Sequence, residues 1–485
     1  MKTIRIKLIL GFLCILSAQS CIEDFIEVEI PSRITQGNFP VAEEDFKAIL
    51  TGLYDANRDQ YNTTLFGEDR SDSFDVGIIG TVSDSWAQNL NGGNGLNWRV
   101  YYNLINNINL IISGSENAEF NSSASKGQIL GEAYFLRAFM YFQMIRVWGD
   151  VPLILEPVDQ NTPVVGRSPV SEVMAQIFED LDNSIESFPS DGFNNTKYAA
   201  SRPATYALLA DSKMWNGKVL GGGASDFQDA IAAIDKISGV SLLSDFEDVF
   251  NTKLNSEVIF SIFFDFNEQH GMYASRVSPS GVTIDRVLNP DVPSSTSFNA
   301  RANYRPSDNI INLYTNSSDQ RLDKSIIPIL VADGPDPGSE PDIESYAQNK
   351  FKGTNANNDT FYDNDIIVYR WADMLLLRAE AKAALNQIPE AVADLNLVRQ
   401  RAGTGLYNGP LDKNTIEREI LDERGRELFL ELKRYWDLVR FDAGGTINIY
   451  NQVPNLQGSN IPLLWPVNDN LIAENDLIEQ TPGYD

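Results

Sequence analysis

The chain has 485 residues, of which 43% are hydrophobic and 10% aromatic, and its formal net charge is −29. This composition is typical of a folded globular protein and excludes a largely disordered one, and a chain of this length can bury a sizeable core. The negative charge repels phosphate backbones and therefore argues against nucleic-acid binding.

The first 20 residues have the pattern of a secretory signal peptide. Three cations precede a short apolar run over residues 8–16, and small residues follow it. The run is too short to span a bilayer, which takes about 20 apolar residues. Removal of this leader would take the three cations with it and change the formal net charge from −29 to −32.

Cys21 is the only cysteine that remains after this cleavage, because Cys14 lies in the leader. Cys21 therefore has no internal disulfide partner, and a free thiol in an exported protein indicates a use of its own. We predict that Cys21 is lipidated, since each buried methylene of an acyl chain contributes about 0.8 kcal/mol to membrane anchoring. The alternative is an ordinary signal peptide with a chance cysteine.

Apolar residues recur at helical spacing through most of the chain. We expect helices over 41–59, from 98, over 126–148, from 168, and over 203–220, 226–237, 369–386, 389–403 and 415–441. The helix over 126–148 is apolar nearly all round, which predicts burial on most sides. The run Gly221–Gly223 follows a helix and is interpreted as a linker.

These helices can be grouped into about four pairs, at 41–113, 126–188, 203–238 and 369–402. The last two pairs are helical hairpins of about 34 residues, the length of a tetratricopeptide unit. Such pairs stack because each buries its apolar face only against a neighbour. The predicted fold class is therefore mainly α, with a tetratricopeptide-like helix-pair scaffold in a single domain over 21–485.

Two segments, about 61–97 and 240–365, break the helical pattern. They are polar and irregular, and short apolar runs within the second, such as 258–264, predict strands. Long irregular segments on a helical scaffold are where function usually lies, so we expect a loop-rich, partly β ligand-binding region there.

Several kinds of chemistry are missing. His270 is the only histidine, so a two-histidine zinc site is excluded, and we interpret His270 as a polar loop residue. There is no cysteine-based zinc spacing and no phosphate-binding loop. The acidic run 333–342 lacks the spacing of an EF-hand and is interpreted as an exposed turn. We predict no metal site and no cofactor.

Acidic residues are abundant, but a glycosidase needs two of them facing each other about 5 to 10 Å apart, which a sequence does not reveal. In the run over 417–434, acids alternate with basic residues, and we interpret it as a solvated or ion-paired surface. Arg137 and Arg146 lie in an apolar helix and are interpreted as buried, paired cations.

Aromatic residues outside the helical stripes are the best candidates for ligand contact, because a flat ring beside polar groups matches the apolar faces and hydroxyl rim of a sugar. Trp86 lies in the polar, glycine-rich stretch "GTVSDSWAQNLNGGNG". We predict that it contacts a ligand, and the alternative is that it anchors its loop. The further ligand-binding candidates are Asn89, Arg70, Asp72, Phe266, Tyr273 and Tyr304. The tryptophans at 98, 148, 215, 371, 436 and 465 are interpreted as packing residues.

Four segments resemble the SusD/RagB family of outer-membrane lipoproteins. They are "WRVYYNLINNINLII", "GEAYFLRAFMYFQMIRVWGDVPLI", "YRWADMLLLRAEAKAALNQIPEAVADLNLVRQRAG" with "ILDERGRELFLELKRYWDLVRF", and "LWPVNDNLIAENDLIEQTPGY". The acids at 23 and 24, directly after Cys21, belong to the same pattern. The resemblance implies four tetratricopeptide-like helix pairs under a loop-rich part, and a surface lipoprotein that is not an enzyme.

The resemblance also implies a partner, a SusC-like TonB-dependent transporter that receives the captured ligand. We therefore predict a surface-exposed outer-membrane lipoprotein that binds an oligosaccharide or polysaccharide, with a neutral glycan favoured by the acidic charge. A peptide-binding member of the same family is the alternative, and a surface hydrolase is a further one.

Overall fold

The computed structural model describes residues 41–484, apart from 160, 195, 272, 280–287, 290, 296–301, 333–340 and 358. The predicted leader and the lipidation site at Cys21 lie outside these residues, as does most of the acidic run 333–342. Among the described residues, no helix combines the length and the apolar content that a membrane span requires.

Helices make up most of the regular structure, and the longer ones occupy the positions that the apolar spacing predicts, with one exception described below. The longer ones are α2 (Glu43–Tyr61), α3 (Arg99–Gly114), α4 (Ser123–Trp148), α5 (Val170–Ser187), α6 (Arg202–Val219), α7 (Ala224–Asp235), α12 (Trp371–Ala384), α13 (Ile388–Arg401), α14 (Lys413–Glu427) and α15 (Arg434–Ala443). The shorter ones are α8 (Asp248–Asn251), α10 (Asp308–Ile311), α11 (Leu322–Ser325), α16 (Ile449–Gln452) and α17 (Asp469–Glu474).

Helix α4 is packed against several neighbours because its sequence is apolar on nearly every side. Ser122 caps its first turn by accepting a hydrogen bond from the Ser125 N–H at 3.0 Å. The helix ends at Trp148 because Gly149 adopts a left-handed φ of 73°. Every side chain over 135–148 is buried, against α2, α3, α5 and α6 among others. The burial predicted from the uniform hydrophobicity of this helix is confirmed.

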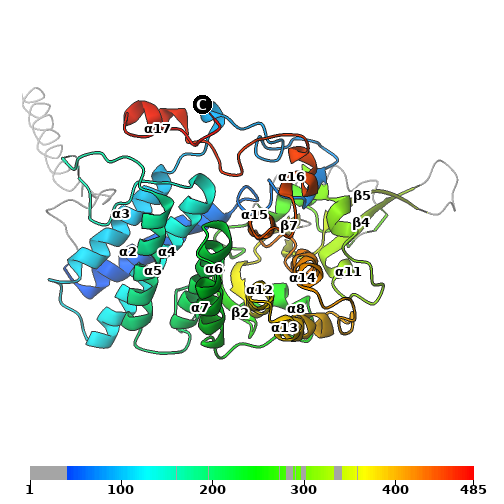
Figure 1. Cartoon of the computed structure of the whole chain (residues 1–485), viewed down its shortest axis with the longest axis horizontal. Coiled ribbons are helices and arrows are strands. Elements are labelled where there is room, and N and C mark those ends of the chain that lie inside the picture. The colour runs from blue at the N-terminus through cyan, green and yellow to red at the C-terminus, as the bar shows by residue number, and fades with distance from the viewer. Residues whose placement is uncertain are drawn as a thin grey trace, which may run out of the picture. The chain divides into compact units, whose positions relative to one another are not determined.

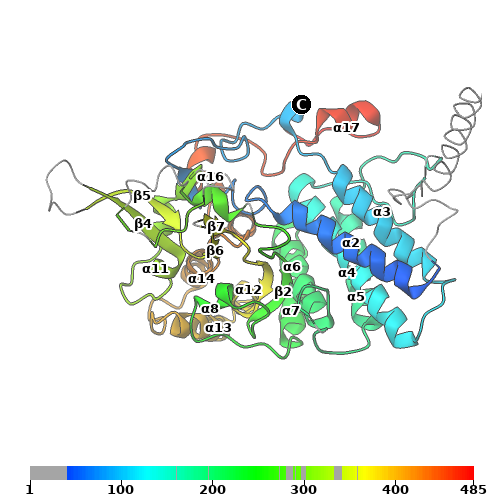
Figure 2. The same cartoon turned by 180° about the vertical axis from the view of Figure 1, so that it is seen from behind.

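Consecutive helices pack as pairs: α2 with α3, α4 with α5, α6 with α7, and α12 with α13. Neighbouring pairs then contact one another, α5 with α6 and α7 with α12, so the helices lie side by side (Figure 1). Alanines on α12 and α13 are buried, and their small side chains permit a close approach of neighbouring helices. Seen from behind, α2 crosses in front of α3, α4 and α5 (Figure 2).

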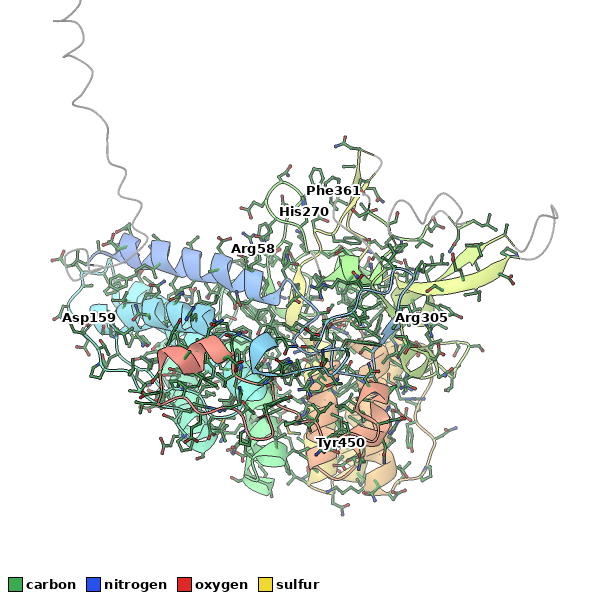
Figure 3. The ribbon with its side chains drawn as sticks, turned by 90° about the horizontal axis from the view of Figure 1, so that it is seen from above. Arg58, Asp159, His270, Arg305, Phe361 and Tyr450 are labelled. Atoms are coloured by element: carbon green, nitrogen blue, oxygen red, sulfur yellow. The ribbon has the colours of Figure 1, made fainter. Side chains whose placement is uncertain are left out.

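The strands form two-stranded antiparallel sheets that connect distant parts of the chain. These sheets pair β1 (Phe74–Val76) with β3 (Tyr304–Pro306), β2 (Val258–Ile262) with β8 (Ile366–Arg370), β4 (Ile326–Val331) with β5 (Asp342–Gln348), and β6 (Thr354–Ala356) with β7 (Asp359–Phe361). The strand predicted in the apolar run 258–264 is confirmed as β2. In the β6–β7 hairpin, Phe361 lies beside His270 (Figure 3).

The prediction of one continuous helix over 415–441 is wrong. Helix α14 ends at Glu427 and α15 begins at Arg434, and between them Leu430 and Leu432 both have a left-handed φ of 60°. This break is stabilised by contacts from elsewhere in the chain. The Leu432 N–H donates to the buried Glu68 carboxylate at 3.0 Å, which continuation of the helix would not allow.

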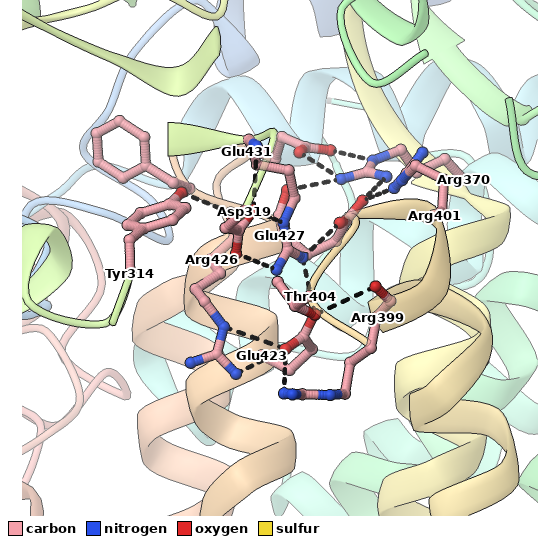
Figure 4. Close-up of polar contacts among 12 residues, drawn as sticks. Tyr314, Asp319, Arg370, Arg399, Arg401, Thr404, Glu423, Arg426, Glu427 and Glu431 are labelled. Atoms are coloured by element: carbon pink, nitrogen blue, oxygen red, sulfur yellow. Dashed lines mark hydrogen bonds and ion pairs between the residues drawn. The ribbon is translucent and has the colours of Figure 1, made fainter. Parts of the chain in front are cut away.

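The interpretation of the run 417–434 as a surface is also wrong, because most of its charges are buried in a network of ion pairs (Figure 4). Arg370, at the end of β8, bonds Glu427 at 2.5 Å and Glu431 at 2.7 Å. Arg321 bonds Glu427 at 2.9 Å, and Arg401 pairs with the same carboxylate. The network fastens the irregular region to the helices.

The two arginines of α4 are buried and paired, as predicted. The Arg137 guanidinium donates to both oxygens of Asp180, at 2.6 and 2.8 Å. Arg146 lies 3.5 Å from Asp211, and its guanidinium also lies over the ring of Phe142, 4.2 Å from the centroid. These cations are therefore matched by partners inside the scaffold, where a lone charge would be costly, and are not placed to contact a ligand.

Candidate functional site

Trp86 lies in the loop between β1 and α3, and its position in that loop is fixed by hydrogen bonds. The indole Nε1–H donates to the Phe74 carbonyl at 3.0 Å, and the backbone N–H donates to the Ser83 hydroxyl at 3.0 Å. The backbone carbonyl of Trp86 accepts from the Asn455 amide at 2.9 Å. Both ends of the residue are thus held, and the ring has a defined orientation.

A column of aromatic rings supports Trp86 from the core outward. Phe429 contacts the Phe74 ring edge-on, with centroids 6.4 Å apart. Phe74 stacks on Tyr304 at 5.1 Å, with 13° between the ring planes, and the Trp86 ring lies 6.3 Å from Tyr304. The first three rings are buried, whereas Trp86 is only partly buried. Trp86 is therefore the outer end of the column.

Partial exposure distinguishes Trp86 from most of the other tryptophans. The chain has seven, and those at 98, 148, 215, 436 and 465 are buried, as predicted for packing residues. Trp371 is the other partly exposed one; it begins α12 and lies against Arg378. Trp86 alone combines partial exposure with a position in an irregular, polar loop.

Tyr304 supports the site and does not reach the surface, contrary to its prediction as a ligand contact. It is 1% exposed, and its hydroxyl accepts from the Ser83 N–H at 3.0 Å and donates to Asp69 at 3.3 Å. Burial, together with the Asp69 carboxylate, raises the pKa of Tyr304 to about 12. The phenol is thus neutral at physiological pH and serves to hold the loop.

Arg70 is likewise buried, and its guanidinium donates its hydrogen bonds within the protein. Its guanidinium donates to Gln88 at 2.9 Å and to the carbonyls of Pro462 and Leu463 at 2.7 and 2.8 Å. It also lies over the ring of Trp465, 4.6 Å from the centroid. Arg70 joins the loop to the C-terminal segment, so the prediction that it bonds ligand hydroxyls does not fit its position.

Asp72 is 1% exposed and forms a bidentate ion pair with Arg434, at 2.7 and 3.0 Å. Gln452 donates to the same carboxylate at 2.7 Å. Burial alone would raise the pKa of Asp72, but the Arg434 guanidinium outweighs it and holds the pKa below its usual value. Asp72 therefore has a structural role, and the prediction of a ligand contact does not fit it either.

Asn89 is the polar candidate that does reach the surface. Its N–H donates to the Asp84 carbonyl at 2.9 Å, which closes a turn around Trp86. Asn94 donates to the Asn89 carbonyl at 2.7 Å. The side chains of Asn89 and Asp84 are both exposed. Asp84 precedes Trp86 in the sequence and Asn89 follows it, so the turn carries a carboxylate and an amide close to the indole in the chain.

The two other aromatic candidates differ from each other. Tyr273 is 1% exposed and packs edge-on against Phe351, with centroids 5.0 Å apart, so it belongs to the core. Phe266 is partly exposed and contacts Phe361 at 4.8 Å. His270 donates from Nε2 to the Phe266 carbonyl at 2.7 Å. Phe266 thus belongs to a second aromatic cluster, on and beside the β6–β7 hairpin.

Comparison with known proteins identifies the family. A model described as "SusD family" matches residues 344–484, and a second, "Starch-binding associating with outer membrane", matches residues 24–212. The chain is a SusD-like protein. "SusD-like protein P38" of Formosa agariphila is 28% identical to it over 96% of each chain. "Starch-binding protein SusD" of Bacteroides thetaiotaomicron is 39% identical, over 26% of this chain and 22% of that protein.

Solved structures agree with this assignment. B. fragilis NanU superposes with a TM-score of 0.82 and 28% identity, covering 94% of this chain and all of that one. A "Laminarin binding SusD-like protein" has a TM-score of 0.73 and 22% identity, covering 92% of this chain and all of that one, and shows the shared fold. The predicted family, and the mainly α fold with tetratricopeptide-like helix pairs, are confirmed.

Residues that the sequence did not single out complete the candidate site of this SusD-like protein. Phe74 and Phe429 extend the aromatic column, and Asn455 fastens the Trp86 loop from the C-terminal segment. No local pattern indicated them, because their contacts join residues hundreds of positions apart. Within the described ranges, no group of three His, Cys, Asp or Glu side chains could hold a metal ion.

Proposed function

We propose that this SusD-like protein is a non-catalytic glycan-binding lipoprotein of the cell surface, and that Trp86 is its main contact with the sugar. The observation that carries this proposal is the partly exposed indole, held at the outer end of a buried aromatic column. Relatives named for binding starch and laminarin support a carbohydrate ligand.

The geometry suits weak, reversible binding. A fixed indole offers one flat apolar face, while Asn89 and Asp84 offer hydrogen-bonding groups in the same turn. An open site of this kind is expected to bind with micromolar to millimolar dissociation constants. Such affinity favours transfer of the ligand to a second protein, and we propose a SusC-like TonB-dependent outer-membrane transporter as the receiver.

The ligand that best fits the charge is a neutral glycan. The chain carries a net charge of −29, and Asp84 lies exposed beside Trp86, so a sulfated or uronic polymer would be repelled. Arg305, which follows Tyr304 on β3, is paired with Asp75 and Asp308, each at 2.8 Å.

The proposed location is the outer membrane. The family model over residues 24–212 is described as associating with that membrane, and Cys21 provides the predicted attachment point for a lipid. A Cys21→Ser variant is expected to lose labelling by an alkyne fatty acid and to be released from the membrane fraction. Unchanged membrane association of that variant would contradict the anchor.

The experiment is affinity electrophoresis in gels that contain starch, laminarin or the neutral fructan inulin, with chromatography of the incubated polysaccharide. Retardation in at least one gel without shorter products is expected, and Trp86→Ala should abolish it while Trp371→Ala does not. Release of oligosaccharides would show an enzyme instead. Absence of retardation in every gel, with binding of casein-derived peptides by calorimetry, would favour the peptide-binding alternative.

A further inference from the structure

A groove with a volume of about 590 Å³ lies between α3, the chain excursion over 151–168, and α17. Of its lining residues, only Trp98, directly before α3, comes from the segment between β1 and α3 that carries Trp86. Val151 and Ser168 form an antiparallel bridge at the base of the excursion, and the two legs that leave this bridge both line the groove. The outgoing leg is 152–158 and the returning leg is 162–165.

Exposed apolar side chains gather around this groove. Val158, Val164 and Val165 line it and are 38%, 63% and 43% exposed. Leu477 is 52% exposed and lies against Gly166 of the returning leg. Exposed apolar residues that stand singly need no explanation, but a cluster around one concave surface indicates an interaction site.

The outgoing leg presents its backbone as the edge of a strand. The Ile154 N–H and C=O are both bonded to the Tyr141 hydroxyl, at 2.8 and 2.9 Å. The carbonyls on either side, of Pro152 and Glu156, accept from Tyr102 and Asn109. These bonds fasten one edge of the leg to α3 and α4.

The opposite edge of the leg is largely unpaired by the residues that the structure describes. In an extended chain, successive residues direct their backbone groups to opposite edges. Leu153 therefore faces away from Tyr141, and among the residues that the structure describes neither its N–H nor its C=O has a hydrogen-bond partner. Within the described part of the chain, the Leu155 N–H has no partner either, but the Leu155 C=O accepts from Arg137 of α4 at 3.3 Å. The free groups of this edge are therefore those of Leu153 and the Leu155 N–H. Such an edge is a template for a further strand.

The rim of the groove is mostly acidic. Glu156 and Asp159 are exposed at the end of the outgoing leg (Figure 3 labels Asp159). Glu474 lies on α17 and pairs with Arg99, so three carboxylates face a single cation. Backbone hydrogen bonding from Asn161 lowers the pKa of Asp159, which keeps that carboxylate ionised at neutral pH.

We propose that this groove binds an extended polypeptide segment of a partner protein, which adds as a strand to the free edge at Leu153 and Leu155. Main-chain hydrogen bonds would supply the affinity, and alternate apolar side chains would cover Val164 and Val165. A basic residue of the segment would face Glu156 and Asp159. A glycan has no row of amide groups to match this edge, so the groove is distinct in chemistry from the Trp86 site.

The test is fluorescence anisotropy with the mature protein and a labelled peptide, acetyl-Lys-Val-Thr-Val-Thr-Val-amide. Two further versions carry N-methyl groups on the odd or on the even residues, so that each blocks one edge of the peptide. Saturable binding is expected, with at least a tenfold loss for one methylated version and little loss for the other. That asymmetry is specific to strand pairing.

Two protein variants test the position of the binding surface. One introduces negative charge into the groove, and the other introduces it at an exposed valine elsewhere. Val164→Asp combined with Val165→Asp should weaken binding of the unmodified peptide at least tenfold. Val76→Asp, at a residue that is 47% exposed on β1, should leave it unchanged. Absence of saturable binding, equal binding of both methylated peptides, or an unaltered affinity of the double variant would each overturn the proposal.

Discussion

Two polar regions of this protein differ in how far their functional-looking side chains are buried. The run over 417–434 is dense in charges, yet those charges are buried and matched, with Arg370, Arg321 and Arg401 sharing Glu427. The loop around Trp86 carries fewer charges, and it ends in one partly exposed ring above buried Tyr304. The difference shows that a concentration of charged residues marks a structural network here, whereas the proposed recognition surface rests on a single supported indole.

The largest expected effect is on the buried network. Glu427→Gln removes the charge that three guanidiniums share and leaves them partly unmatched, so the free energy of unfolding should fall by about 3–5 kcal/mol. Chemical denaturation measures this. Asp308→Asn is the control, because that carboxylate is 71% exposed in its pair with Arg305, and its loss should change stability by less than about 1 kcal/mol. Equal effects of the two substitutions would contradict the distinction.

The same network predicts a dependence on acid. Burial alone would raise the pKa of Asp373, but Lys433 and Arg424 outweigh it and hold the pKa at about 2, below the ordinary 3.8. A lowered pKa contributes stability that is present above pH 4 and is lost as the pH falls toward 2. The expected loss is about 2 kcal/mol. Urea unfolding of the protein and of Asp373→Asn between pH 5 and 2.5 should show a shallower decline for the variant; identical slopes would refute the assignment.

The sequence predicted the scaffold well because helices depend on local spacing. The periodicity over 41–59 and 126–148 alone located α2 and α4, and the apolar run at 258–264 located β2. The break between α14 and α15 was missed because it depends on Glu68, which lies more than 300 residues away in the chain. A local pattern contains no information about such a contact.

The same physical limit applies to the site. Trp86 could be chosen from its polar surroundings, since a ring among glycines and asparagines has few apolar neighbours in sequence. Arg70 and Asp72 lie in the same polar segment and looked equally accessible, but their partners at 434 and 462–465 bury them. Residue type predicted the candidates, and only tertiary contacts separate the exposed from the buried.

Substitution of Trp86 should change the free energy of ligand binding by less than substitution of Glu427 changes the free energy of unfolding. Trp86→Ala should weaken the binding of a retained glycan at least tenfold, or about 1.4 kcal/mol, as measured by isothermal titration calorimetry. Trp86→Phe keeps a ring over Tyr304 and should lose less. Trp371→Ala removes the other partly exposed tryptophan and should have no effect; a comparable loss in that variant would contradict a specific role for Trp86.

The smallest effect is expected at the second aromatic cluster. Phe266 contacts Phe361 and His270, and no described contact joins it to the Trp86 loop. Phe266→Ala should change the dissociation constant of the same glycan by less than threefold in the same calorimetric titration. A tenfold change would extend the binding surface to the β6–β7 hairpin and would weaken the contrast between one supported ring and the rest of the surface.

The most direct measurement is a crystal structure with a bound oligosaccharide derived from the polysaccharide that retards the protein. The account predicts a sugar ring lying flat against the outer face of the Trp86 indole, with carbon atoms about 4 Å apart, and the glycosidic bonds intact. Density for the sugar only at another surface, such as the groove beside α17, with Trp86 uncovered, would contradict it.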